Sequence, residues 1–369
     1  MAAQTDVELK KLMDAFVCVR LVQMGGVDLS VFQFDPFLSW SVFLMNGDKT
    51  IYGRYGRASP KTKRSRADSN PNHTLVGLKA ALRKALEFHR GYARDPATYS
   101  RILAPKTGRT PIWKTVESTP SARKYRRVGR VQDGSPKSCI HCHEVQRMAI
   151  DSFFMTKRRV RDDMLWVYPS PESLGVELSV DHCARVTAVV DQSFAAKAGL
   201  RVGDDILTLN RQPLLSIADV QWVLHQFPDP GGKLSVEVLR GGKRLELALT
   251  LPDLWRQRGD FGWRYRVAGY AAWLWSGVTL QDHPEGIRVA NLSPRWFKKP
   301  NPSARRVLRP GDVITAVDGK VGMTRSLYLA HLMRDKKLGS TVTLRVLRNG
   351  RAMEVRFKIP TTQPEVQGH

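Results

Sequence analysis

Two cysteines and a histidine in the middle of the chain have a spacing that can attach a haem. Residues 139–143 read Cys-Ile-His-Cys-His. In c-type haem attachment, two thiols at this spacing form thioethers with the haem vinyl groups, and the histidine that follows is an axial ligand of the iron. A methionine further along the chain would be the second axial ligand. The residues expected at this haem c or metal site are Cys139, Cys142, His143, Met155 and Met164.

Three other interpretations fit the same residues. The cysteine pair could be a redox dithiol or disulfide, or it could bind zinc with His141, His143 or His182. The pattern is also short enough to occur by chance. A cytochrome domain normally has more helical sequence around its haem than residues 105–170 contain. If haem is attached, the protein must be exported, because c-type attachment takes place outside the bacterial cytoplasm.

The C-terminal half contains an internal repeat. Gly203-Asp204-Asp205-Ile206 recurs 108 residues later as Gly311-Asp312-Val313-Ile314, and the same offset relates Leu239-Arg240 to Leu347-Arg348. Each copy ends in two alternating β runs separated by a glycine turn, which predicts a hairpin. Residues 217–227 have apolar side chains at helical spacing. The repeat therefore predicts two small β-rich domains, each with one principal helix.

These copies resemble PDZ domains of the bacterial, protease-associated HtrA type. The resemblance depends on the run Ser-Phe-Ala-Ala-Lys-Ala-Gly-Leu-Arg-Val-Gly-Asp-Asp-Ile at residues 193–206 and on the Leu-Gly-Val-Glu-Leu loop at residues 174–178. In the second copy the loop is Ser-Gly-Val-Thr-Leu at residues 276–280, but Arg306-Val307-Leu308 replaces the Ala-Gly-Leu element. The resemblance covers about residues 173–252 and 272–360.

The resemblance implies a protein- or peptide-binding adaptor. In such a site an extended peptide pairs with an exposed edge strand beside a helix, and N–H groups of the preceding loop capture a terminal carboxylate. The expected partners are therefore protein C-termini or extended segments. The residues expected to bind them are Leu174, Gly175, Val176, Glu177, Leu178, Ile217, Val220, Leu224, Gly277, Val278 and Leu280.

The N-terminal third looks like the later part of a thioredoxin fold. A β run spans residues 16–22, a hairpin is predicted at residues 40–55 around Asn46-Gly47, and a helix at residues 75–90. The redox Cys-x-x-Cys of that fold is absent, and we expect Cys18 to be a core residue. The domain order resembles a bacterial family of thioredoxin-like/PDZ proteins found notably among planctomycetes. The missing redox motif implies that the chain starts inside the thioredoxin fold. The alternative function is that of a thiol oxidoreductase whose redox cysteines lie upstream of this chain.

The chain is strongly basic. It has 59 Lys and Arg against 34 Asp and Glu, a net charge of +25, which attracts nucleic acid, acidic membrane surfaces or acidic proteins. No nucleic-acid-binding motif accompanies the charge, so we do not expect nucleic acid as a partner; the basic runs could contact a membrane surface. No 18-residue apolar stretch or signal peptide is present. The chain is thus cytoplasmic if its start is genuine, and periplasmic or in the cell envelope if a leader is missing.

Together these patterns predict an α+β multidomain protein, a partial thioredoxin-like α/β domain followed by two PDZ-like β-rich domains. No Gly-x-Ser-x-Gly, P-loop or HExxH motif is present, so we do not expect an enzyme. The predicted parts are a thioredoxin-like domain at 1–95, a basic linker with the CxxCH motif at 96–170, PDZ domains at 171–254 and 255–362, and a disordered tail at 363–369.

Overall fold

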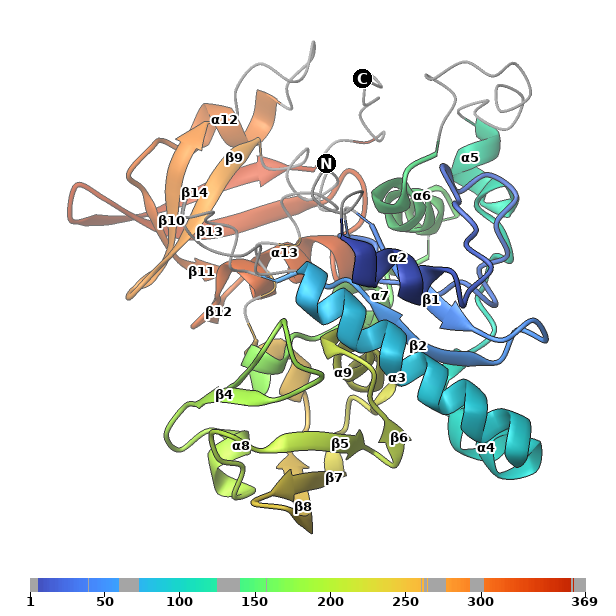
Figure 1. The fold of residues 1–369 in the computed structure, drawn as a ribbon. Coiled ribbons are helices and arrows are strands. Elements are labelled where there is room, and N and C mark those ends of the chain that lie inside the picture. The colour runs from blue at the N-terminus through green and yellow to red at the C-terminus, as the bar shows by residue number, and fades with distance from the viewer. Residues whose placement is uncertain are drawn as a thin grey trace. The chain divides into compact units, whose positions relative to one another are not determined.

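The structure, a computed structural model, forms two compact units (Figure 1). The residues it describes are 6–38, 40–59, 73–124, 140–156, 158–259, 261, 264, 277–292, 302–359 and 361. The first unit comprises residues 1–22, 27–115 and 166–259, and the second comprises residues 23–26, 116–165 and 260–369. Each unit therefore combines one copy of the repeat with an earlier part of the chain, and the predicted linker is divided between the two units.

The first copy of the repeat folds around a four-stranded antiparallel sheet, in the order β6-β5-β7-β8. A separate pair, β3 and β4, joins this sheet through one bridge between Arg185 and Asp205. The elements are β3 (Val176–Leu178), β4 (Val186–Val189), α8 (Phe194–Lys197), β5 (Asp205–Leu209), β6 (Gln212–Pro213), α9 (Ile217–Gln226), β7 (Gly232–Arg240) and β8 (Lys243–Leu251). Inward-facing side chains of β7, such as Leu234 and Val238, pack with those of α9 in one hydrophobic core.

The second copy has the same element order in a continuous sheet. Its main path is β14-β13-β11-β10-β9, and β12 pairs with β11. The elements are β9 (Val278–His283), β10 (Gly286–Leu292), α12 (Pro302–Val307), β11 (Val313–Val317), β12 (Lys320–Val321), α13 (Arg325–Arg334), β13 (Thr341–Arg348) and β14 (Arg351–Lys358). The same unit contains α5 (Pro120–Lys124), α6 (Cys142–Met155) and α7 (Asp162–Leu165).

The two predicted terminal hairpins are confirmed. β7 pairs with β8 in register from Arg240 opposite Lys243, and β13 pairs with β14 from Arg348 opposite Arg351. Each turn has two residues with positive φ, Gly241 and Gly242 in the first copy and Asn349 and Gly350 in the second. Positive φ at both central residues is the geometry of the two-residue turn that matches the twist of a hairpin, and glycine and asparagine adopt it at low cost.

The N-terminal hairpin and helix form as predicted, but not within a larger sheet. β1 (Val42–Met45) pairs with β2 (Ile51–Tyr55), and these two strands form a sheet of their own. The helix expected at residues 75–90 extends over α3 (Leu75–Arg94), where the Thr74 side chain caps its first turn. Two shorter helices, α2 (Val7–Met13) and α4 (Pro96–Leu103), lie in the same unit.

The strand predicted at residues 16–22 does not form, and this corrects the thioredoxin-like interpretation. Val17 and Val19 are 94% and 79% exposed. Cys18, which we expected in a core, is exposed as well. A β run becomes a strand only where a partner strand satisfies its backbone, and none of the described strands pairs with this run. The thioredoxin-like domain is not confirmed.

The repeated Gly-Asp and Leu-Arg motifs are explained by one ion pair in each copy. Asp204 is 1% exposed and accepts two hydrogen bonds from Arg240, at 2.7 and 2.8 Å. Asp312 is equally buried and accepts two from Arg348, at 2.8 and 2.7 Å. Each arginine also donates to a carbonyl of the turn before the aspartate. The pair therefore joins the turn before the central strand to the hairpin, and the sequence repeat preserves both partners.

In the described part of the chain, no helix is both long and apolar enough to cross a membrane.

We predict that Asp204→Asn lowers the free energy of unfolding by about 1.5–3 kcal/mol, the contribution of hydrogen bonds to a buried charge. Asp205→Asn is the matched control, because this neighbouring carboxylate pairs with a half-exposed Arg185 at 2.7 Å; exposed pairs contribute under about 1 kcal/mol. Urea denaturation followed by tryptophan fluorescence measures both. Equal losses from the two substitutions would contradict the prediction.

The same pair makes stability depend on pH. Burial raises the pKa of Asp204, but the hydrogen bonds from Arg240 and the Arg201 N–H outweigh burial and leave it below its usual range. The folded state therefore binds this proton more weakly than the unfolded state. Asp204 makes its full contribution to the free energy of unfolding above the pKa of an unfolded aspartate, about 3.9. This contribution is lost as the pH falls through the lower pKa that Asp204 has in the folded protein. The urea midpoints of Asp204→Asn and of the unchanged protein should therefore differ at neutral pH and converge once the pH falls below the lowered pKa of the folded protein.

Candidate peptide-binding grooves

The first candidate groove has the walls that the sequence predicts. Leu174 ends the short 3₁₀ helix Pro171–Leu174, and Gly175 turns the chain into β3 with a φ of +79°. A Cβ on Gly175 would lie 2.1 Å from the Cβ of Ser193, so only glycine fits there. The opposite wall is α9. The apolar side chains of the predicted residues on both walls are buried in one core, whereas Glu177 is half-buried. A guest would therefore meet backbone and helix surface rather than these apolar side chains.

The helix α9 is covered on every side. All eight residues from Ile217 to Leu224 are buried, including the polar Asp219 and Gln221. A helix that forms one wall of an open groove would have a solvent-exposed polar face. In this unit that face instead contacts the N-terminal elements, and β2 is the strand that packs against α9.

Residues 54–59 cross the mouth of this groove. The Arg57 guanidinium lies 2.6 Å from the carboxylate of Glu172, in the loop that precedes β3. The Ala58 carbonyl accepts a hydrogen bond from Gln221 of α9 at 3.2 Å, and the Arg54 carbonyl accepts one from Ser216 at 2.6 Å. The segment therefore contacts both walls, and Gly56 to Ser59 are all buried.

Charge strengthens the contact at the loop. Burial raises the pKa of Glu172, but Arg57 and the Ser170 hydroxyl outweigh burial and leave the pKa below its usual range. Glu172 is therefore ionised at neutral pH, and its charge is compensated by Arg57, whose side chain is 5% exposed. A charge-assisted hydrogen bond of this kind is roughly twice as strong as one between neutral groups.

A buried ion pair holds the N-terminal elements on α9. Lys106 Nζ lies 2.9 Å from the carboxylate of Asp219, and both side chains are 1% exposed. The same carboxylate accepts hydrogen bonds from the backbone N–H groups of Arg54, at 3.1 Å, and Leu215, at 2.8 Å. The Arg54 guanidinium lies over the Trp222 ring, 3.7 Å from its centroid. Burial lowers the pKa of Lys106, and Asp219 offsets part of that change.

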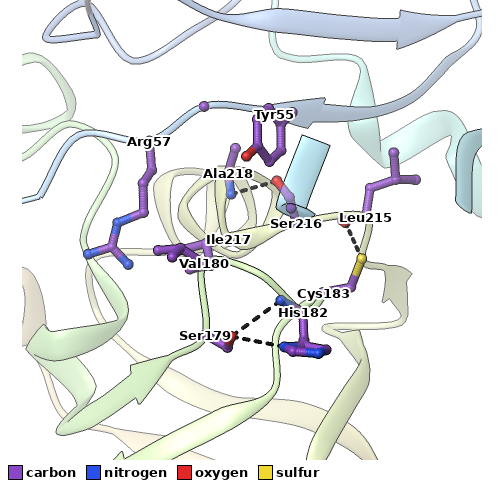
Figure 2. Close-up of a pocket in the computed structure, with 12 residues that line it drawn as sticks. Tyr55, Arg57, Ser179, Val180, His182, Cys183, Leu215, Ser216, Ile217 and Ala218 are labelled. Atoms are coloured by element: carbon purple, nitrogen blue, oxygen red, sulfur yellow. Dashed lines mark hydrogen bonds between the residues drawn. The ribbon is translucent and has the colours of Figure 1, made fainter. Parts of the chain in front are cut away.

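A small, open pocket remains beside the start of α9. Figure 2 shows Tyr55 and Arg57 on one side of it, and Ser179 and His182 on the other, with the first turn of α9 between them. The Cys183 thiol donates to the Leu215 carbonyl at 2.8 Å, and burial raises its pKa to about 11. Cys183 is therefore a protonated, poorly reactive thiol at neutral pH.

The second candidate groove lies between β9 and α13. Gly277, with a φ of +63°, precedes β9, and Val278 and Leu280 are buried. Thr279 is half-buried and Gln281 exposed. β9 is an edge strand of its sheet among the described strands. At one end the Asp282 carboxylate accepts from the Arg325 N–H at 2.9 Å, which joins the strand to the start of the helix.

The CxxCH motif lies only partly within the described residues. Cys139 and the side chain of His143 lie outside them. Cys142 is the first residue of α6, and burial raises the pKa of its thiol. The described residues contain no cluster of three or more His, Cys, Asp or Glu side chains that could hold a metal ion.

The structure corrects one of the two predicted methionine ligands. Met155 ends the same continuous helix that begins at Cys142, so it lies twelve residues beyond His143, about 18 Å along the axis at 1.5 Å per residue. It cannot reach an iron bound by His143. Met164 is placed differently, because its carbonyl accepts a hydrogen bond from Gln146 in the first half of α6, at 2.7 Å.

Sequence reasoning missed the residues that close the first groove: Arg54, Arg57, Lys106, Asp219 and Gln221. We considered the basic ones only as part of a net charge that attracts nucleic acid, acidic membrane surfaces or acidic proteins. Asp219 was the one detectable signal, because it is a carboxylate inside an otherwise apolar helical stretch, where an ionised group needs a partner.

Comparison with known proteins identifies the repeated domains. The model of the PDZ domain family matches residues 172–251 and again residues 277–359. The chain contains two PDZ domains. The two PDZ domains account for β3 to β8 and β9 to β14 (Figure 1).

The curated relatives are DegP-like proteins. One, from Pseudomonas savastanoi pv. phaseolicola, is named a probable periplasmic serine endoprotease DegP-like; it is 32% identical over 204 residues, which cover 51% of this chain and 39% of the relative. A relative of the same name from Pseudomonas fluorescens is 30% identical, covering 51% of this chain and 40% of the relative. The chain thus spans about two fifths of the length of these relatives.

Among solved structures, the serine endoprotease from Yersinia pestis is similar at 25% identity, covering 29% of this chain and 36% of that chain with a TM-score of 0.21. Together with the PDZ match, the DegP-like relatives support PDZ domains of the HtrA type. The thioredoxin-like and planctomycete parts of the sequence resemblance receive no support from these comparisons.

We predict that Lys106→Met destabilises the first unit by about 3–5 kcal/mol, because it leaves the Asp219 charge buried without its ionic partner. Lys114→Met is the matched control: this lysine also pairs with an aspartate, Asp28 at 3.4 Å, but its side chain is 74% exposed, so the expected loss is under about 1 kcal/mol. Chemical denaturation of the two variants tests this, and a small loss for Lys106→Met would contradict it.

Proposed function

We propose that this chain binds extended segments of other polypeptides through its second PDZ domain, in the periplasm or at the cell envelope. The observation that carries the proposal is the edge position of β9 beside α13. An edge strand has backbone N–H and C=O groups that a guest strand can pair with. The first PDZ domain is less suited in this conformation, because residues 54–59 lie across its groove.

The proposed location follows the relatives. Two of them are named as probable periplasmic proteins, and the aligned region is about half of this chain. The proteolytic activity in their names belongs to proteins of which this chain spans about two fifths. PDZ domains bind peptides, and peptide binding is the only function that we assign to this chain.

The charge of the chain narrows the class of partner. With a net charge of +25, the protein attracts acidic polypeptides and repels basic ones over distances up to about a Debye length, roughly 10 Å at 0.1 M salt. We therefore propose acidic, extended segments as the preferred guests. Acidic membrane surfaces could also bind the basic residues, and would then compete with acidic polypeptides for them.

Site-specific photo-crosslinking of the full chain tests the groove assignment. Fluorescein-labelled β-casein, an unfolded acidic polypeptide, is the probe, and benzoylphenylalanine is introduced at Gln281, which is exposed on β9. We expect crosslinking at Gln281 that weakens with added salt. The control places the same crosslinker at Met353, which is 41% exposed on β14, the opposite edge of the sheet. Equal or stronger crosslinking at Met353 would reject the β9 groove as the binding site.

A c-type haem at residues 139–143 is our second proposal. It is supported by the position of Cys142 at the start of α6 and by the packing of Met164 near that end of the helix. Cys139 and Cys142 would form the thioethers, and His143 and Met164 would be the axial ligands. A bound haem would supply one-electron transfer next to the second PDZ domain.

Absorption spectra test the haem proposal. Expression with the cytochrome c maturation machinery should give a Soret band and a haem-stained band on a denaturing gel, both absent from Cys142→Ser. Met164→Ala should keep the covalent haem but change its axial ligation, whereas Met155→Ala should leave the spectrum unchanged because of its distance along α6. Purified protein without a Soret band would reject haem attachment.

A further inference from the structure

We propose that residues 56–59 are an internal ligand of the first PDZ domain, and that their release opens a second, latent peptide-binding groove. This inference goes beyond the proposed function, which concerns the β9 groove of the second domain. It states which segment occupies the first groove and which contact must break before a guest can enter.

The route of the segment supports this assignment. β2 ends at Tyr55, and Gly56 turns the chain with a φ of +99°, where an added Cβ would lie 2.9 Å from the Trp40 carbonyl. Only glycine makes this turn without strain. The chain then runs along α9 to the loop before β3, the two elements that hold a peptide in a PDZ domain.

The occupant fits the groove incompletely. Neither Arg57 Nε nor Ser59 Oγ, both buried, has a hydrogen-bond partner among the described residues. Buried polar groups that make no hydrogen bond weaken the state that contains them. In addition, the segment contacts the domain through the side chains of Glu172 and Gln221, and within the described residues its backbone makes no hydrogen bond with β3. A guest that pairs with the β3 backbone would make bonds that the internal segment does not.

A small pocket beside α9 lies at the edge of the covering segment. It is bounded by Tyr55, Gly56 and Arg57 of the covering segment and by Ser179 and Val180 at the end of β3. Figure 2 shows Arg57 leaning away from this pocket, and the side chain's partner, Glu172, lies in the loop at the far end of the groove. The Arg57–Glu172 ion pair is therefore the latch, and the pocket is the part of the groove that the segment leaves uncovered.

Cys183 reports opening without any ligand, because its thiol lines the pocket and is half-buried. We expect Arg57→Ala and Glu172→Gln each to raise the rate of Cys183 alkylation by iodoacetamide about tenfold or more, through local opening. The double variant should be no faster than the faster single variant, because both remove the same contact. Peptide mass mapping resolves each cysteine, and the exposed Cys18 is the fast internal reference.

Arg83→Ala is the matched control, because Arg83 pairs with Glu8 at the half-exposed surface of the same unit; its Cys183 rate should equal that of the unchanged protein. Cys142, half-buried in the second unit, reports opening of that unit, and urea denaturation followed by tryptophan fluorescence reports unfolding of the whole protein. A faster Cys183 with an unchanged Cys142 and an unchanged urea midpoint supports the latch. An unchanged Cys183 overturns it, and so does a faster Cys183 accompanied by a lower urea midpoint, because residues 56–59 would then be an inseparable part of the fold.

Peptide binding to the opened first groove is tested with labelled β-casein, the probe that is also used for the second PDZ domain. A photo-crosslinker at Glu177, half-buried on β3, should capture labelled β-casein in Arg57→Ala but not in the unchanged protein. If Gln281 crosslinks and Glu177 does not in Arg57→Ala, the internal-ligand proposal fails while the proposed function stands. If Glu177 crosslinks and Gln281 does not, the proposed function fails while the latent groove stands.

Discussion

The buried ion pair between Lys106 and Asp219 is the constraint on which the first unit depends. Two charges at 2.9 Å with 1% exposure have lost nearly all of their hydration, and each is stable there only while the other remains. The pair joins a residue of the N-terminal part to the helix α9 of the first PDZ domain. Separating these parts would expose α9 and leave one charge unpaired at each surface, so the N-terminal elements and the PDZ domain form one cooperative unit.

This constraint explains why two copies of one domain have different roles. Both copies keep the Asp–Arg pair that connects the turn to the hairpin, Asp204 with Arg240 and Asp312 with Arg348. The interior of the domain is therefore conserved within the repeat. The helix surfaces are not. In the first copy α9 has Asp219 and Gln221, which bind the N-terminal elements, whereas the corresponding positions of α13 are Leu327 and Leu329.

A PDZ groove closed by its own chain is compatible with protein binding if closure is reversible. The ion pair of Lys106 and Asp219 lies deep in the unit, while that of Arg57 and Glu172 lies at the groove, where Glu172 is 20% exposed. The first contact holds the N-terminal elements in place and the second holds the segment in the groove. Because the two contacts are separate, the groove can open without the unit coming apart.

The sequence alone determined the two PDZ domains and their hairpins, since these depend on local turn chemistry, on alternation of apolar residues and on motifs repeated at a constant offset. It also predicted the β1–β2 hairpin and α3. Only the tertiary structure decided that residues 16–22 find no partner strand, that Met155 lies too far from His143, and that Arg54 to Ser59 cross the first groove. Those outcomes depend on contacts such as that of Arg57 with Glu172, 115 residues apart, and side-chain type and spacing along the chain carry no information about which distant surfaces meet.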